Sequence, residues 1–153
     1  MSLNGPRPII RRYEQKDRDA VLSLAKRYTS WDHTPTPADI EGFYSSSPEL
    51  FFVAETEGKV LGFVYGRESK YLPGETLMKW KASKAASIET LAVDEAYRRR
   101  GIGTSLLNKL FEIFRMNGID LVTLSVPVEE TEARKLYQKP GFEEGAYFLR
   151  KRL

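Results

Sequence analysis

The sequence predicts an α/β fold, a single domain in which helices cover a central β-sheet. β-rich runs and amphipathic helical runs alternate along most of the 153-residue chain. A chain of this length, with 41% hydrophobic and 29% charged residues, is typical of one globular domain with a real core. We expect the domain to cover residues 8–153 and residues 1–7 to form a flexible leader.

The first half of the domain is expected to hold a strand, two helices and a β-hairpin. Pro8–Tyr13 is the strand, and Asp17–Thr29 has apolar residues at helical spacing. Thr36-Pro37 is a helix start, with threonine as N-cap and proline at the first helical position. Glu49–Ser69 contains two β-rich runs, which Glu57-Gly58-Lys59 joins as a hairpin turn.

The second half is expected to alternate strands and helices. A basic excursion is followed by a strand and a strongly amphipathic helix that ends at an Asn-Gly pair. A strand buried on both faces, a short helix and a β-like run then close the chain. In order, these segments are Lys70–Lys84, Ser87–Asp94, Ile102–Phe114, Ile119–Val126, Glu129–Lys139 and Gly141–Leu153.

Composition excludes several classes of site. Without cysteine there is no disulfide framework, thiolate metal site or cysteine nucleophile, and this favours a cytoplasmic protein. The single histidine, His33, is expected to be a surface or packing residue, so we expect no metal. No apolar run approaches the roughly 20 residues that span a bilayer. The net charge of +3 suits an anionic ligand but does not predict nucleic-acid binding.

The turn between Val93 and Leu106 has the pattern of an anion site. Gly101 and Gly103 let a ligand approach the free N–H groups of a helix start, where the helix dipole is positive. Phosphates commonly bind there. The chain has no Walker motif, and Leu106 occupies the third glycine position of the dinucleotide fingerprint. A phosphate ligand of another kind is therefore indicated.

Two motifs together resemble the GNAT family of N-acetyltransferases. Arg98-x-x-Gly101-x-Gly103, directly after "LAV", resembles the acyl-CoA-binding signature of that family. "EARKLYQKPGF", residues 132–142, resembles its second hallmark, a helix with Leu-Tyr before a Gly-Phe pair. The resemblance covers the chain from about Pro8 onward. It implies a mixed central sheet and an enzyme that transfers acetyl from acetyl-CoA to a primary amine.

The resemblance also implies where the cosubstrate binds. The backbone of Leu91, Ala92 and Val93 would pair with the pantetheine arm, as an added edge strand does. The side chains of Arg99 and Arg100 either contact phosphate or only raise the local positive potential. The pyrophosphate would lie against the turn and the first helical residues: Arg98, Arg99, Arg100, Gly101, Ile102, Gly103 and Thr104.

Two catalytic residues follow from the same resemblance. Tyr137 would act as general acid toward the departing thiolate; the alternative is a core aromatic residue. Glu89 would accept a proton from the acceptor ammonium, a role that burial would favour; the alternative is a solvated strand residue. An N–H at or near Leu91 would stabilise the oxyanion. Many relatives have asparagine where this chain has Glu130, which accepts hydrogen bonds but donates none when ionised.

Three functions remain open on the sequence alone. They are an N-acetyltransferase, a CoA-binding sensor without significant catalysis, and a basic domain that binds RNA or an acidic protein. Acceptor choice is expected to lie in residues 28–47 and 70–85, which contain Trp31, Tyr44 and Trp80 but no acidic cluster typical of a polyamine site. Protein N-termini, lysine side chains and small amines all remain candidate acceptors. Exposed sheet edges favour a homodimer.

Overall fold

The fold is built on a five-stranded mixed sheet. The computed structural model describes residues 7–153, so the expected leader lies almost wholly outside the described residues. The strand order is β1-β2-β3-β4-β5; β1 to β4 are antiparallel neighbours, and β5 is parallel to β4. The strands are Ile9–Arg12, Phe51–Thr56, Lys59–Glu68, Ala85–Val93 and Leu121–Thr123. The predicted mixed sheet is confirmed.

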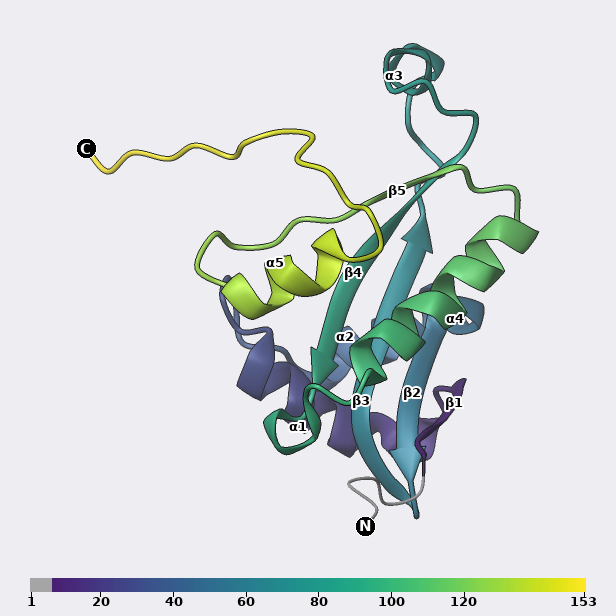
Figure 1. Ribbon diagram of the computed structural model, residues 1–153, viewed down its shortest axis with the longest axis vertical. Coiled ribbons are helices and arrows are strands. Elements are labelled where there is room, and N and C mark those ends of the chain that lie inside the picture. The colour runs from purple at the N-terminus through teal and green to yellow at the C-terminus, as the bar shows by residue number, and fades with distance from the viewer. Residues whose placement is uncertain (1–6) are drawn as a thin grey trace.

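Helices cover both faces of this sheet. Figure 1 shows α1 and α2 on one face and α4 and α5 on the other, with α3 beyond one end of the sheet. The short helix α3 lies within the basic excursion Lys70–Lys84, to which the sequence assigned no helix. The helices are Arg18–Tyr28, Pro37–Ser46, Gly74–Lys79, Ile102–Met116 and Thr131–Gln138.

Each face has its own hydrophobic core. On one face, α1 and α2 pack on an aromatic cluster in which the rings of Tyr13 and Phe51 stack at 4.1 Å between centroids. On the other face, the apolar side of α4 packs against the sheet through Leu106, Leu110 and Phe114. Burial of large apolar side chains on both faces stabilises the sheet. Strand β4 is thereby held on both sides.

Two local signals in the sequence form as predicted. Thr36 caps α2 at the Asp39 N–H, and the Asp39 carboxylate accepts from the Thr36 N–H at 2.8 Å, which completes a capping box. In the β2–β3 turn, Glu57 and Gly58 have φ angles of 51° and 80°. Two successive left-handed residues are the signature of a type I′ hairpin, which matches the twist of the flanking strands.

The last part of the chain departs from the predictions. Strand β5 has only three residues, all half-buried, whereas a strand buried on both faces was expected over Ile119–Val126. The β-like run Gly141–Leu153 forms no strand. A strand needs a partner for its N–H and C=O groups. In residues 7–153, β4 is the one strand that pairs with β5, and no strand pairs with the run 141–153. Tyr147, Phe148 and Leu149 are consequently exposed.

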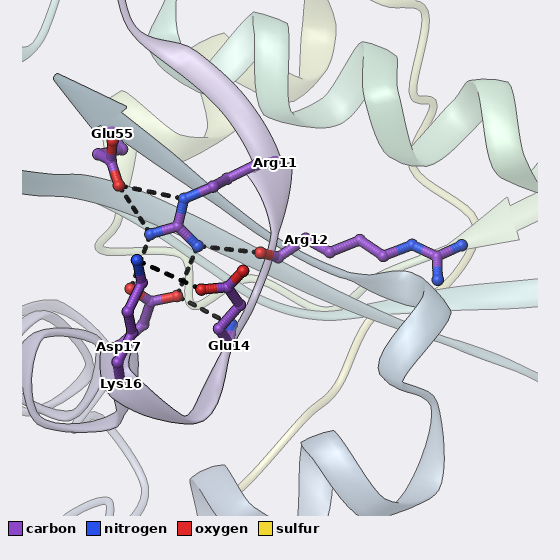
Figure 2. A network of polar contacts seen from close by, with 6 residues as sticks. All are labelled: Arg11, Arg12, Glu14, Lys16, Asp17 and Glu55. Atoms are coloured by element: carbon purple, nitrogen blue, oxygen red, sulfur yellow. Dashed lines mark hydrogen bonds and ion pairs between the residues drawn. The ribbon is translucent and has the colours of Figure 1, made fainter. Parts of the chain in front are cut away.

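A network around Arg11 fixes the start of the domain to the sheet. Figure 2 shows the guanidinium between two carboxylates, with Asp17 and Glu55 each 2.8 Å away. Asp17 is 4% exposed and also accepts from the Glu14 N–H at 2.9 Å. Burial alone would raise the pKa of Asp17, but the hydrogen bonds from Arg11 and Glu14 outweigh it and lower that pKa. The network joins β1, the segment before α1, and β2.

Candidate active site

The site lies where β4 and β5 separate. Strand β5 pairs only with Ala85–Ser87 of β4, so the edge of β4 that faces it has no strand partner beyond Ser87 in the described chain. Residues 88–91 of β4 and residues 124–127 after β5 form two walls of a cavity of about 260 Å³. The unpaired edge continues through Leu91, Ala92 and Val93, where the sequence placed the pantetheine arm.

Glu89 occupies a β-bulge at the entrance to this edge. Tyr65 of β3 pairs with Thr90 and Gly66 with Ile88, which leaves Glu89 as the extra residue. A bulge re-aims a side chain and is frequent beside active sites. Glu89 lines the cavity, and its Oε1 lies 3.3 Å from Arg67 Nε. The side chain remains 37% exposed, so the burial that would favour a base role is slight.

Tyr137 lines the same cavity from α5, across from β4. Its ring packs edge-on against Phe142, with the two centroids 5.7 Å apart. Burial raises the pKa of the phenol to about 12, so the hydroxyl keeps its proton at neutral pH. Tyr137 is therefore both a packed aromatic residue and a proton-bearing group at the cavity wall. These were the two interpretations that the sequence left open.

The arginine turn adopts a backbone that only some residues tolerate. Arg99 and Gly101 have φ angles of 65° and 77°, and Gly101 is the N-cap of α4. The left-handed conformation favours glycine at position 101. A Cβ at Gly103 would lie 3.0 Å from Leu136 of α5, so this second glycine lets the two helices approach. No side chain caps α4, and its first N–H groups stay available to a ligand.

Arg98 is held by the protein itself. Its Nε donates to the Val93 carbonyl at 3.2 Å, and its guanidinium lies 4.6 Å from the centroid of the Tyr28 ring. The Tyr28 hydroxyl accepts from the Glu95 N–H at 2.9 Å. Tyr28 therefore connects α1 to the first part of the turn. The sequence placed Tyr28 on the apolar face of a helix and at the start of the acceptor segment 28–47. It did not predict this contact, since periodicity says nothing about a segment so far along the chain.

Comparison with known proteins identifies the family. The profile of the acetyltransferase (GNAT) family matches residues 18–142. An N-acetyltransferase of Methanocaldococcus jannaschii is 33% identical over 138 residues, which are 89% of this chain and 78% of the relative. The chain belongs to the GNAT family.

Solved structures agree with this assignment. Ard1 from Thermoplasma volcanium has a TM-score of 0.76 and 32% identity, covering 92% of this chain and 86% of its own. The NatC complex, solved with Gag peptide and CoA, has a TM-score of 0.76 over 92% of this chain and 87% of its own. At 17% identity that likeness concerns the fold alone. As a GNAT protein, the chain is an acyltransferase of the N-acetyltransferase class.

Residues outside the GNAT motifs also reach the cavity. Of the three aromatic residues expected to contact an acceptor, Trp31 lines it, whereas Tyr44 packs against Tyr13 and Trp80 follows α3. His33 lines it too, although the sequence gave this residue no role in a site. Within residues 7–153, no helix combines the length and apolar character needed to cross a membrane.

Proposed function

We propose that this GNAT protein transfers the acetyl group of acetyl-CoA to a primary amine by direct attack within a ternary complex. One observation carries the proposal. The cavity between β4 and residues 124–127 has Glu89 on one wall and Tyr137 on another, and the unpaired edge of β4 leads from it toward the glycine turn. A candidate proton acceptor and a candidate proton donor thus line one cavity, and strand β4 leads from it to the candidate anion site.

The residues present suit acetyl-CoA, which supplies the activated thioester. The backbone of Leu91, Ala92 and Val93 would hold the pantetheine arm along the unpaired edge. The N–H groups from Arg99 to Thr104 would hold the pyrophosphate, because α4 begins there without a side-chain cap. Ile102 is buried and contributes only its backbone. Arg99 and Arg100 add positive potential.

The chain's own groups would then transfer the protons of the reaction and stabilise the negative charge that develops on the carbonyl oxygen. Glu89 accepts a proton from the acceptor ammonium, directly or through water, and so makes the amine nucleophilic. The N–H at or near Leu91 donates to the developing oxyanion. As the C–N bond forms and the C–S bond breaks, Tyr137 donates its proton to the departing sulfur. The second proton lost by the amine nitrogen then returns to Tyr137, directly or through water. A phenol with a pKa of about 12 is protonated throughout the neutral range, as a donor must be.

Mass spectrometry and steady-state kinetics test this proposal together. The intact protein, incubated with acetyl-CoA and no amine, is expected to keep its mass, because direct attack forms no acetyl-enzyme. With a reactive amine, initial-rate plots against both substrates are expected to intersect. Parallel lines with an acetylated protein would contradict direct attack. Binding of acetyl-CoA without transfer to any amine would instead favour the CoA-binding sensor.

A further inference from the structure

The cavity carries a charge opposite to that of the whole protein. The chain has a net charge of +3, yet the part of the cavity lining that the structure describes contains four carboxylates and neither lysine nor arginine. These carboxylates come from three stretches of the chain: Asp32 and Asp39 from the first, Glu89 from the second and Glu130 from the third. Low-dielectric walls focus the field of such groups and raise the local concentration of cations.

The carboxylates stand on different walls. Asp32 and Asp39 belong to the α1–α2 loop and α2, Glu89 to β4, and Glu130 to the start of α5. Arg67 pairs with Glu89 at 3.3 Å and so offsets part of its charge. Glu130 makes no ion pair within residues 7–153, and its side chain does not cap α5. The free negative charge is therefore greatest away from β4.

His33 contacts both aspartates of the cavity wall that the α1–α2 loop and the start of α2 form. Its Nδ1 lies 3.2 Å from Asp32 Oδ1 and its Nε2 lies 3.6 Å from Asp39 Oδ2. Hydrogen bonds from the Thr36 N–H, and more weakly its hydroxyl, lower the pKa of Asp39, so this carboxylate is ionised at neutral pH. Even with His33 protonated, the two aspartates leave this wall negative.

The rest of the lining suits an aliphatic group. Trp31, Phe43 and Leu124 provide apolar surface between the charged walls. Thr90 also lines the cavity, and its Oγ1 is buried without a hydrogen-bond partner in the described structure. The volume of about 260 Å³ lies below the usual range for ligand pockets, which favours a small acceptor.

Building on the proposed function, we propose that the acceptor is a small aliphatic amine that carries a second positive charge. The amine that reacts lies between Glu89 and Tyr137, while the second cation is held by Asp32 and Glu130. The shared chemistry is that of a dication, which either a free diamine or a short peptide with lysine beside its amino terminus supplies. A run of acidic residues was absent from the sequence because the fold assembles this charge from three stretches of the chain.

Matched acceptors test the second charge. The full chain, with acetyl-CoA, is assayed with 1,5-diaminopentane against n-pentylamine, and with Ala-Lys-Ala-amide against Ala-norleucine-Ala-amide. Release of CoA thiol reports transfer, and the absence of cysteine from the chain removes any background from the protein. The dication of at least one pair is expected to have about a tenfold higher kcat/KM than its partner, about the effect of one charge pair in a partly solvated site.

Variants assign that preference to the cavity. Asp32→Asn and Glu130→Gln remove charge without removing a helix cap, and each is expected to reduce the preference severalfold while acetyl-CoA affinity by calorimetry stays unchanged. Glu75→Gln, in α3 and outside the cavity, is the matched control and should keep the full preference. Asp39 is unsuitable, because its carboxylate also caps α2.

The outcomes separate the two proposals. A preference shown by the diamine pair alone identifies a small-molecule source, and one shown by the peptides alone identifies a peptide source. Equal rates within both pairs, a preference that survives both variants, or acetyl-CoA binding without transfer to any of the four would overturn the second-charge inference. Failure to bind acetyl-CoA at all would instead overturn the proposed function.

Discussion

Arg11 and the arginines at 98–100 use the same side chain in opposite ways. Arg11 lies between Asp17 and Glu55, each 2.8 Å away, and its charge is matched within the protein. Arg98 is held equally firmly, but by the Val93 carbonyl and the Tyr28 ring. Arg100 lies over the Tyr97 ring at 5.3 Å. Within residues 7–153, none of the arginines at 98–100 makes an ion pair with a carboxylate.

Pairing with a carboxylate distinguishes an arginine that stabilises the fold from arginines whose charge remains available to a ligand. A partly buried arginine that has two carboxylate partners fixes the elements that carry them. Arginines held by a carbonyl and aromatic rings are positioned without being neutralised, so their field remains beside the glycine turn. The Arg11 network is therefore expected to govern stability, and the turn to govern affinity for acetyl-CoA.

Removal of Arg11 should produce the largest change in stability. Arg11→Met leaves Asp17, which is 4% exposed, without its cationic partner. Loss of one member of a buried pair costs about 3 kcal/mol. Urea denaturation measures this loss. Arg18→Met, which removes a pair with Glu41 in which both side chains are exposed, is the control and should change stability by less than about 1 kcal/mol.

Tyr137→Phe should lower activity with little effect on folding. The ring still packs against Phe142, but the proton donor is lost. General acid catalysis typically contributes at least about a hundredfold, so kcat is expected to fall by that factor while acetyl-CoA affinity is retained. Steady-state kinetics and calorimetry on the same preparation measure both. An unchanged kcat would assign Tyr137 to packing alone.

Acid should abolish the advantage that Arg11 confers. The pKa of Asp17 is lowered in the folded state, so its contribution to stability is present above its unfolded value of about 4 and is lost as the pH falls through the folded value. The gap in unfolding free energy between the wild type and Arg11→Met should therefore close below about pH 4. A gap in unfolding free energy that stays constant from pH 7 to pH 3 would show that ionised Asp17 does not contribute to the stabilisation by Arg11.

Gly101→Ala tests the backbone of the turn. Its φ of 77° disfavours any residue with a Cβ, and the cost for one residue is about 1 kcal/mol. A Cβ there meets no atom within 4 Å, so the effect is conformational rather than steric. Thermal denaturation should show a small loss of stability, accompanied by weaker acetyl-CoA binding. Gly74→Ala, which also has open space but no positive φ, is the control.

Neutralising the exposed arginines should have the smallest effect. Arg99→Gln and Arg100→Gln are each expected to weaken acetyl-CoA binding a few-fold at low salt, and the loss should shrink as salt screens the potential. Calorimetry at two ionic strengths measures this. A large loss that persists at high salt would mean that these side chains contact phosphate directly.

The sequence predicted what depends on local pattern. Apolar spacing located α1 and α4, and Thr36-Pro37 located the start of α2. The sequence-based predictions failed where contacts between distant segments determine the local structure. The extent of β5 and the absence of a strand over Gly141–Leu153 depend on pairing partners, and the bulge at Glu89 depends on the register of β3. The acidic cavity could not be predicted either, since Asp32 and Glu130 are far apart in the sequence and come to line one cavity only in the fold.

A single pair of variants tests most directly whether the glycine turn binds acetyl-CoA. Thr104 is exposed on the first turn of α4, and Thr104→Glu and Thr104→Gln differ in charge but hardly in size. A glutamate there favours the helix through its dipole, so folding is preserved while phosphate is repelled. Calorimetry with acetyl-CoA is expected to show near wild-type affinity for Thr104→Gln and at least about tenfold weaker binding for Thr104→Glu. Equal affinity for the two variants would contradict the assignment of the turn as the pyrophosphate site.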